Sequence, residues 1–433
     1  MLQSKLFSKT IREAPKDEKS INAQLLVKAG FIDRLASGIY TFLPLGYKVI
    51  KKIETIIKEE MEEIGGQELL LPALHPKEIW QKTGRWETME DLYKLRAGKG
   101  EFALGPTHEE VVVPLAKKFI QTYKDLPTFL FQIQTKFRKE KRAKSGLLRG
   151  REFLMKDLYS FHTSETDLDE YYEKVKGAYF NILKRVGIAE RTYLTYASGG
   201  TFSKYSHEFQ TTTSAGEDII YICQKCGQAV NKEIKPETPR CPNCQGKLFK
   251  REKAVEVGNI FKLKTKFSEP FGLYFTDRQG QKKLVQMGCY GIGLGRLMGT
   301  VVEIFHDEKG IIWPKEVAPF QIHLIELESR NSKLHTPPPP SHPRGGPLVR
   351  SIAEKIYQNL LKGKSEVLYD DRNDRSAGEK FADCDLIGIP TRIVISERTL
   401  KQSSVEFKKR NEKKTKLVKI SNIKNFLIAQ LTN

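Results

Sequence analysis

The chain has 433 residues, of which 39% are hydrophobic, and it carries a formal net charge of +20. That length holds two or three domains with real cores, which excludes a fibrous or largely unfolded protein. The positive charge favours a polyanionic partner, and no apolar run approaches the roughly 20 residues that span a membrane.

Residues 1–6 lack the pattern of a secretory signal peptide, so we expect a cytoplasmic protein. The first strong periodic signal is an amphipathic helix that ends at Gly65 and Gly66. Its apolar face comprises Val49, Ile53, Ile57, Met61 and Ile64. An apolar strand over residues 69–71 is predicted after it, before Pro72.

A basic segment, residues 136–153, follows in the chain. Arg138 and Glu140 form an Arg-x-Glu pair, and Arg149 stands four residues before Phe153, which suggests an antiparallel hairpin with a basic loop. Guanidinium groups bind phosphate well, and an aromatic ring can stack on a purine. The alternative is a solvated basic hairpin, because charge runs are usually surface features.

Four of the six cysteines are clustered as two Cys-x-x-Cys pairs. They are Cys223, Cys226, Cys241 and Cys244. Four thiolates can close a tetrahedral zinc site, and such a site is structural because it leaves no open position for water. Reduced surface thiols are the alternative. Cys289 and Cys384 are isolated, and we expect packed thiols there.

The glycines of residues 291–296, read Gly-Ile-Gly-Leu-Gly-Arg, let backbone approach a ligand closely. Their spacing differs from the G-x-G-x-x-G of a dinucleotide site. With the arginines of residues 136–153, Arg296 predicts a triphosphate site.

The pattern changes after Trp313 and Pro314, which predicts a domain boundary near residue 315. Helices and strands then alternate, which indicates an α/β sheet. The predicted elements are a strand over 320–327, a helix over 348–361, a strand over 366–368, a helix over 378–382 and a strand over 392–395.

Two stretches of this C-terminal part have a biased composition. Residues 331–347 are rich in proline, and we expect an exposed loop, either a flexible insertion or a ligand for a partner's aromatic groove. Residues 407–419 carry seven Lys or Arg against one Glu, which fits either a solvated strand pair or direct RNA contact.

Together with the arginine and glycine segments, three short runs resemble the bacterial prolyl-tRNA synthetases, a family of class II aminoacyl-tRNA synthetases. These runs are GPTHEE at 105–110, REFLMKD at 151–157 and YSFH at 159–162. The amphipathic helix, the basic hairpin and residues 291–296 resemble the three signature motifs of class II. In that family, the first motif forms a dimer interface.

The resemblance implies an α/β fold: an α+β catalytic domain with the antiparallel class II sheet, a small zinc-ribbon-like module, and a C-terminal α/β anticodon-binding domain. The implied domains are 1–220 and 251–315 for catalysis, 221–250 for the cysteine module, and 316–433 for anticodon binding.

The implied activity is ATP-dependent ligation of proline to tRNA(Pro) through prolyl-adenylate, with Mg²⁺ and with release of pyrophosphate and AMP. A synthetase-like paralogue that binds tRNA without ligation is the main alternative. A zinc-ribbon nucleic-acid-binding protein is a weaker one, because it leaves the arginine segments unexplained.

Site residues follow from the same resemblance. The proline pocket would comprise Thr107, Glu109, Arg138, Met155, Asp157 and Tyr159. ATP would bind to Arg138, Glu140, Arg149, Phe153 and Arg296, with Arg138, Glu140 and Arg296 taking part in catalysis. Anticodon contact is carried over to Arg372, Glu406, Lys408 and Arg410.

Many bacterial members of this family have a large editing domain between the second and third motifs, where this chain has only the cysteine module. The implied consequence is that alanine is rejected by pocket fit alone, which gives only about 10- to 200-fold discrimination. A separate trans-acting editing protein is therefore an expected partner, beside tRNA(Pro).

Overall fold

The computed structural model describes residues 1–14, 18–141, 143, 145–200, 202, 204–327 and 347–432. The proline-rich run predicted at 331–347 lies outside these residues, except for Pro347. Within the described ranges, no helix is long and apolar enough to cross a membrane.

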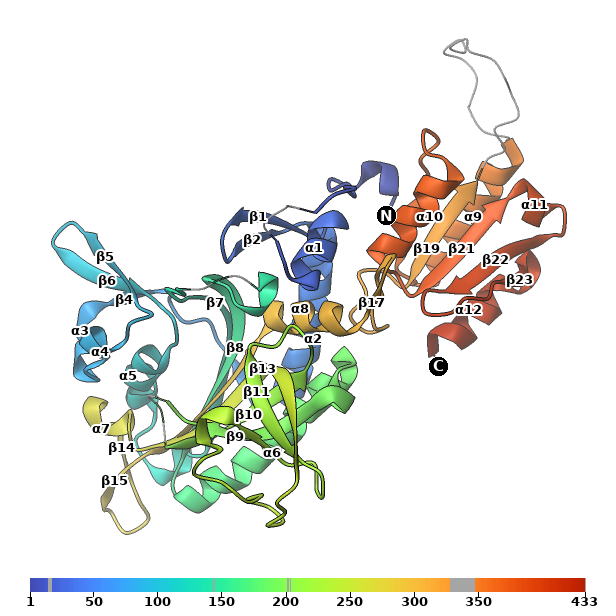
Figure 1. The fold of residues 1–433 in the computed structure, drawn as a ribbon. Coiled ribbons are helices and arrows are strands. Elements are labelled where there is room, and N and C mark those ends of the chain that lie inside the picture. The colour runs from blue at the N-terminus through green and yellow to red at the C-terminus, as the bar shows by residue number, and fades with distance from the viewer. Residues whose placement is uncertain are drawn as a thin grey trace.

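A nine-stranded sheet forms the centre of the larger part of the molecule, with the strand order β10-β9-β12-β11-β13-β16-β8-β7-β3 (Figure 1). Its strands are β3 (Gln67–Glu68), β7 (Thr128–Phe137), β8 (Glu152–His162), β9 (Thr192–Ser198), β10 (Tyr205–Thr212), β11 (Asp218–Cys223), β12 (Ala229–Asn231), β13 (Phe249–Lys264) and β16 (Gln286–Gly293). Because β10 also pairs with β13, strands β10, β9, β12, β11 and β13 close into a ring. The predicted module 221–250 starts inside β11 and ends inside β13, and its bounds stay a prediction.

The basic segment folds around an antiparallel hairpin of β7 and β8, as predicted. The pairing runs from Thr128 opposite Phe161 to Phe137 opposite Glu152, so Arg138 and Arg149 lie just beyond the paired residues. Arg138 still bonds through its backbone N–H to the carbonyl of Arg151, at 2.9 Å.

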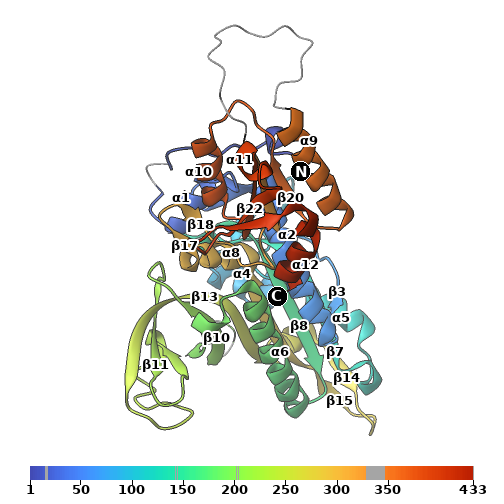
Figure 2. The ribbon, with the colours of Figure 1, turned by 90° about the vertical axis from the view of Figure 1, so that its right-hand side faces the viewer.

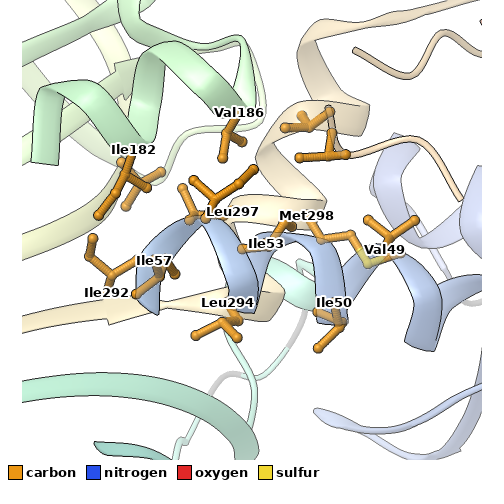
Figure 3. Close-up of a cluster of buried hydrophobic side chains, with 14 of the residues drawn as sticks. Val49, Ile50, Ile53, Ile57, Ile182, Val186, Ile292, Leu294, Leu297 and Met298 are labelled. Atoms are coloured by element: carbon orange, nitrogen blue, oxygen red, sulfur yellow. The ribbon is translucent and has the colours of Figure 1, made fainter. Parts of the chain in front are cut away.

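The predicted amphipathic helix is α2 (Pro44–Glu63). It packs against α6 (Glu165–Val186) and α8 (Leu294–Ile304). Figure 3 shows this contact, with Ile53 and Ile57 of α2 facing Ile182 of α6 and Leu297 of α8. The period of the apolar residues, close to that of an α-helix, produces this buried stripe.

The predicted strand over 69–71 is wrong, because the strand at this point is β3 (Gln67–Glu68). Leu69 still bonds to the carbonyl of Phe131, but the N–H of Leu71 donates to the side chain of Gln132 at 3.0 Å. Leu70 is 74% exposed. The apolar residues 69–71 therefore do not extend the β3–β7 pairing, because the N–H of Leu71 bonds to a side chain and not to a backbone carbonyl.

Smaller elements flank this sheet. The N-terminal ones are α1 (Ile21–Lys28), β1 (Ile32–Ala36) and β2 (Ile39–Phe42). A three-stranded sheet with short helices comprises β4 (Leu74–Pro76), α3 (Lys77–Lys82), α4 (Arg85–Thr88), β5 (Tyr93–Ala97), β6 (Gly100–Leu104) and α5 (Glu109–Phe119). Between β13 and α8 lie α7 (Ser268–Phe271), β14 (Tyr274–Thr276) and β15 (Lys282–Leu284), and after α8 come β17 (His306–Asp307) and β18 (Gly310–Ile311).

A second sheet, with strand order β20-β19-β21-β22-β23, forms the C-terminal part. Its elements are β19 (Ile322–Leu327), α9 (Pro347–Lys362), β20 (Val367–Asp370), α10 (Ala377–Ile387), β21 (Thr391–Ser396), α11 (Glu397–Leu400), β22 (Ser404–Lys409), β23 (Lys416–Lys419) and α12 (Ile423–Thr432). The predicted α/β alternation is confirmed, and residues 407–419 include most of a strand pair.

The N-terminal residues lie on this C-terminal part, beside α10 in Figure 1. Leu2 forms a parallel bridge with Tyr369 at the edge of the second sheet. Ser4 bonds to Asp371 through its N–H (2.9 Å) and its hydroxyl (2.6 Å), and the hydroxyl of Thr10 donates to Asp383 at 2.7 Å.

Lys156 is fully buried on the helix-facing side of β8. Its ammonium donates to the hydroxyl of Tyr179 at 2.6 Å and to the carbonyl of Tyr290 at 3.1 Å, and it lies 3.5 Å from the sulfur of Met61. Burial lowers the pKa of Lys156 from 10.5 to about 7, although Asp157 and Cys289 oppose the shift. The folded protein therefore holds this lysine largely neutral above pH 7.

Lys156→Met should remove a pH dependence of stability. Between pH 7 and 10.5 the unfolded chain binds the proton that the folded chain has lost, so stability rises with pH, by up to about 1.4 kcal/mol per unit. Guanidinium unfolding at pH 7 and 9 would show this rise in the wild type and in an exposed control, Lys174→Met, but not in Lys156→Met. An unchanged rise in Lys156→Met would contradict the assignment.

Candidate active site

Two cavities meet beside β8, β13 and β16. The first has a volume of about 290 Å³, and its walls include Thr107, Arg138, Met155, Asp157, Tyr159 and Arg296. The second, of about 340 Å³, is bordered by Asp91, Glu140, Arg149 and Glu217. Both cavities share Arg138, Glu256 and Arg296, so these three side chains lie between the two spaces.

Strand periodicity places one set of side chains in the first cavity. Met155, Asp157 and Tyr159 are two residues apart on β8, so they project to the same face of the sheet. Gly291 lies opposite Asp157 on β16. A Cβ at Gly291 would lie 2.9 Å from the terminal methyl of Met155, so the glycine keeps this wall open.

Glu109, a predicted pocket residue, is completely buried and does not reach the cavity wall. One of its oxygens accepts from the hydroxyl of Thr107 at 2.6 Å, and the other accepts from the thiol of Cys289 at 3.1 Å. Arg85 of α4 lies 3.5 Å from the first oxygen. Thr107 and Cys289, which do line the cavity, therefore connect Glu109 to it.

Asp157 is held on one side only. Its Oδ2 lies 2.5 Å from the ammonium of Lys136, and it accepts from Gln132 at 3.0 Å and from the hydroxyl of Tyr159 at 3.3 Å. Its buried Oδ1 has no hydrogen-bond partner among the described residues. One carboxylate oxygen of Asp157, a residue of the cavity wall, is therefore unpaired among the described residues.

Lys136 is fully buried, and sequence reasoning missed it. Burial lowers its pKa, although Asp157 opposes the shift. Its ammonium lies 2.8 Å from Nδ1 of His108. Burial, and then Lys136 and His75, lower the pKa of His108 to about 2, so the neutral ring accepts this hydrogen bond. One sequence signal could have identified Lys136 as a site residue. Gln132, Gln134 and Lys136 alternate with less polar residues, which marks a polar face of β7.

The two central arginines are held differently. Arg296 donates to the carbonyls of Leu148 (2.9 Å) and Glu256 (2.6 Å), which fixes its direction. The side chain of Arg138 makes only long hydrogen bonds to the described residues, to the carbonyl of Pro106 at 3.4 Å and to the sulfur of Met155 at 3.8 Å. Burial, and then the charge of Arg296, lower the pKa of Arg138. An anion between them would relieve this repulsion.

The remaining predicted phosphate-side residues border the second cavity or support it. Arg149 forms ion pairs with Glu140 (2.8 Å) and Glu217 (3.0 Å). Phe153 lines neither cavity, and its ring lies 5.4 Å from the guanidinium carbon of Arg138.

The four clustered cysteines come together at the end of β11 and before β13. Their sulfurs all lie within 4.8 Å of one another, and two of the pairs are 3.5 Å apart. Tetrahedral zinc with bonds of about 2.3 Å needs sulfurs about 3.8 Å apart, so the donor set fits this metal. A Cβ on Gly246 would lie 3.2 Å from the sulfur of Cys223.

Two of the predicted anticodon residues are engaged inside the protein. Arg372 binds Asp370 at 2.7 Å and Asp383 at 2.8 Å. Arg410 is 7% exposed and binds both oxygens of Asp307, which connects the second sheet to β17. Glu406 and Lys408 are partly exposed on β22. Anticodon contact by all four stays a prediction.

Lys136→Met should lower the free energy of unfolding by about 3–5 kcal/mol, because it leaves the buried Asp157 without its counter-charge. Adding Asp157→Asn should recover much of this loss, since no charge is then left unpaired. The free energies of unfolding of both variants, measured with guanidinium, test this prediction. Lys139→Met, at an exposed position near Lys136 in the chain, is the control. Equal stability of wild type and Lys136→Met would show that the pair contributes nothing.

Comparison with known proteins gives consistent matches. The description "tRNA synthetase class II core domain (G, H, P, S and T)" matches residues 92–305, and "Anticodon binding domain" matches residues 345–430. A relative from Dehalococcoides mccartyi strain BAV1, named proline–tRNA ligase, is 35% identical over 581 aligned residues, which cover 100% of this chain and 99% of the relative. A relative of the same name from Sulfurihydrogenibium is 34% identical and covers 99% of both chains.

Solved structures agree on the fold. Prolyl-tRNA synthetase from Cryptosporidium parvum, complexed with halofuginone and AMPPNP, gives a TM-score of 0.75 at 20% identity, covering 95% of this chain and 75% of that one. The Giardia lamblia enzyme, in complex with prolyl-adenylate, gives 0.75 at 19% identity, covering 94% and 78%. The 581 aligned positions also exceed the 433 residues of this chain, so the Dehalococcoides relative carries well over a hundred residues without a counterpart here.

Proposed function

This chain belongs to the proline–tRNA ligases, within the class II tRNA synthetases, and from that premise we propose that it ligates proline to tRNA(Pro) at the expense of ATP. The observation that carries the proposal is the position of Arg138 and Arg296 between two adjoining cavities. One cavity would take an amino acid and the other a nucleotide, with the reacting groups meeting at the arginines.

We propose that proline binds in the 290 Å³ cavity. Its secondary ammonium would be held by the free Oδ1 of Asp157 and by the Thr107–Glu109 pair, since a carboxylate facing an ammonium gives a charge-assisted hydrogen bond. Met155 and Tyr159 would enclose the ring, which matches the apolar body of the substrate.

ATP would enter the second cavity as its magnesium complex. The proline carboxylate would attack the α-phosphate in line and displace pyrophosphate as the α–β bond breaks, with Arg138 contacting both reacting groups and Arg149 and Arg296 on the outer phosphates. Catalysis would then consist of positioning and charge neutralisation, as in other phosphoryl transfers. Glu140 would act by orienting Arg149, to which it is bonded. The terminal ribose hydroxyl of tRNA would next attack the prolyl carbonyl and release AMP.

Proline-dependent exchange of pyrophosphate into ATP tests this function. Arg138→Ala should lower the exchange rate by about 100-fold or more, since the guanidinium is lost where charge develops. Arg398→Ala, at an 81% exposed side chain, should leave the rate unchanged. No exchange with proline by folded wild-type protein that still binds tRNA would support the non-ligating paralogue instead.

We also propose a structural zinc ion bound by Cys223, Cys226, Cys241 and Cys244, supported by the spacing of their sulfurs. Metal analysis should find about one zinc per chain. Cys241→Ser should lose the metal and lower the melting temperature, whereas Cys384→Ser, at an equally buried lone thiol, should keep the metal. A metal-free wild type of unchanged stability would reject this site.

The chain should lack editing in cis, because its relatives carry additional residues that it does not have. Alanine should therefore support pyrophosphate exchange only about 10- to 200-fold less efficiently than proline, and alanyl-tRNA should accumulate unless a separate editing protein is added. Rapid hydrolysis of added alanyl-tRNA by the purified protein would contradict this proposal.

We also propose that the protein forms a homodimer and that it is located in the cytoplasm. Both proposals rest on its membership of the family. The exposed Leu70, beside the first signature motif, offers apolar surface for such contact. A solution mass equal to one chain at every concentration would reject the dimer, and cell fractionation tests the location.

A further inference from the structure

A polar groove lies on the ring of strands β9–β13, outside the two cavities of the active site. Its volume is about 520 Å³. Four cationic side chains line it, namely Arg191, Lys250, Arg251 and Lys253. Thr212, Thr213 and Ser214 add hydroxyl groups to the same groove. We call it the basic groove.

The charge of the basic groove is largely uncompensated. Among the described residues of its wall, Glu252 is the one carboxylate, and it pairs with Lys250 at 2.7 Å. Over the described ranges of the chain, Arg191, Arg251 and Lys253 have no ion-pair partner. Lys250, Arg251 and Lys253 are also exposed, so the groove presents cations to the solvent. A polyanion would bind here by direct charge complementarity.

The basic groove and the second cavity lie on two sides of the same turn. Thr213 and Ser214 of the turn between β10 and β11 line the groove, whereas Ala215 and Glu217 line the cavity. The N–H of Thr213 donates to the carbonyl of Lys253 at 3.1 Å, which fixes the turn against β13. A Cβ at Gly216 would lie 2.4 Å from the backbone nitrogen of Ala254, so only glycine allows this close approach.

Strand β13 connects the two sites in the same way. Lys253 lines the basic groove, and the next three residues, 254–256, border the second cavity. The strands of this ring stand out from the body of the molecule, as Figure 2 shows for β10 and β11. A long molecule lying along this lobe could place one end at the active site.

We propose that the basic groove binds backbone phosphates of the tRNA acceptor arm while the 3′ end reaches the aminoacyl-adenylate. Guanidinium, ammonium and hydroxyl groups are the donors that contact phosphates in nucleic-acid complexes. The proposal rests on the function proposed above, which requires the end of a polyanion to enter this active site. Unlike residues 407–419, the basic groove belongs to the catalytic part of the chain.

The test reverses two charges in the full-length protein, with Arg251→Glu and Lys253→Glu together. Proline-dependent pyrophosphate exchange, which needs no tRNA, should stay at the wild-type rate. The KM for tRNA in aminoacylation should rise by about tenfold or more, since phosphate contacts supply most of the sequence-independent affinity. Affinity for tRNA decreases with salt concentration, and the plot of log affinity against log salt concentration should become less steep. The magnitude of its slope should decrease by about 2, one for each lost phosphate contact.

Two controls keep the result interpretable. Lys174→Glu with Lys184→Glu on α6 changes the net charge equally at exposed positions outside the groove, and it should leave the KM for tRNA unchanged. If the double reversal also loses exchange, Arg251→Gln with Lys253→Gln replaces it, because neutral side chains of similar length disturb the strand less. A variant with normal exchange, normal KM for tRNA and an unchanged salt slope would overturn the proposal. Absence of exchange in the wild type would instead reject the proposed function itself.

Discussion

The candidate active site depends on one buried ion pair, Lys136 with Asp157. Both partners come from the β7–β8 hairpin, whose register sets Gln132 opposite Asp157 and thereby brings Lys136 within reach of the same carboxylate. Removing two charges from water is costly, and the attraction between them offsets that cost only when the geometry is good. Here the hairpin supplies the geometry, and the neutral His108 accepts a further hydrogen bond from Lys136. A one-residue slip of β7 would point Lys136 to the helix side and leave Asp157 unpaired.

The same hairpin separates two environments. On the cavity side, the Oδ1 of Asp157 has no hydrogen-bond partner among the described residues, whereas on the helix side the buried Lys156 bonds to a hydroxyl and a carbonyl. Adjacent residues of one strand thus lie in different environments: the Asp157 side chain borders the first cavity, and the Lys156 side chain is held largely neutral among α2, α6 and β16. The apolar packing of α2 against α6 and α8 holds β8 in place. The geometry of the candidate site therefore depends on the hydrophobic core on the other face of the sheet.

Sequence patterns predicted those parts that depend on local periodicity. The helix α2, the β7–β8 hairpin and the alternating elements of the second sheet each carry their own signal. The strand over 69–71 was wrong because composition cannot reveal that the N–H of Leu71 finds a side-chain acceptor, Gln132. The ring of strands was not foreseen, since its closure by β10 and β13 is a pairing between distant segments. The family resemblance pointed to several residues that line the cavities, but not to the burial of Glu109 behind Thr107, nor to the internal ion pairs of Arg372 and Arg410.

The contacts of the first residues with the second sheet have a consequence for synthesis. Ser4 and Asp371 are 367 positions apart, and Thr10 and Asp383 are 373 apart. During translation the N-terminal segment therefore leaves the ribosome long before β20 and α10 are synthesised. It stays undocked while the intervening chain folds. Long-range contacts of this kind form late, because the closure entropy of the whole loop opposes them. Final attachment of residues 2–10 thus reports that translation has passed β20 and α10.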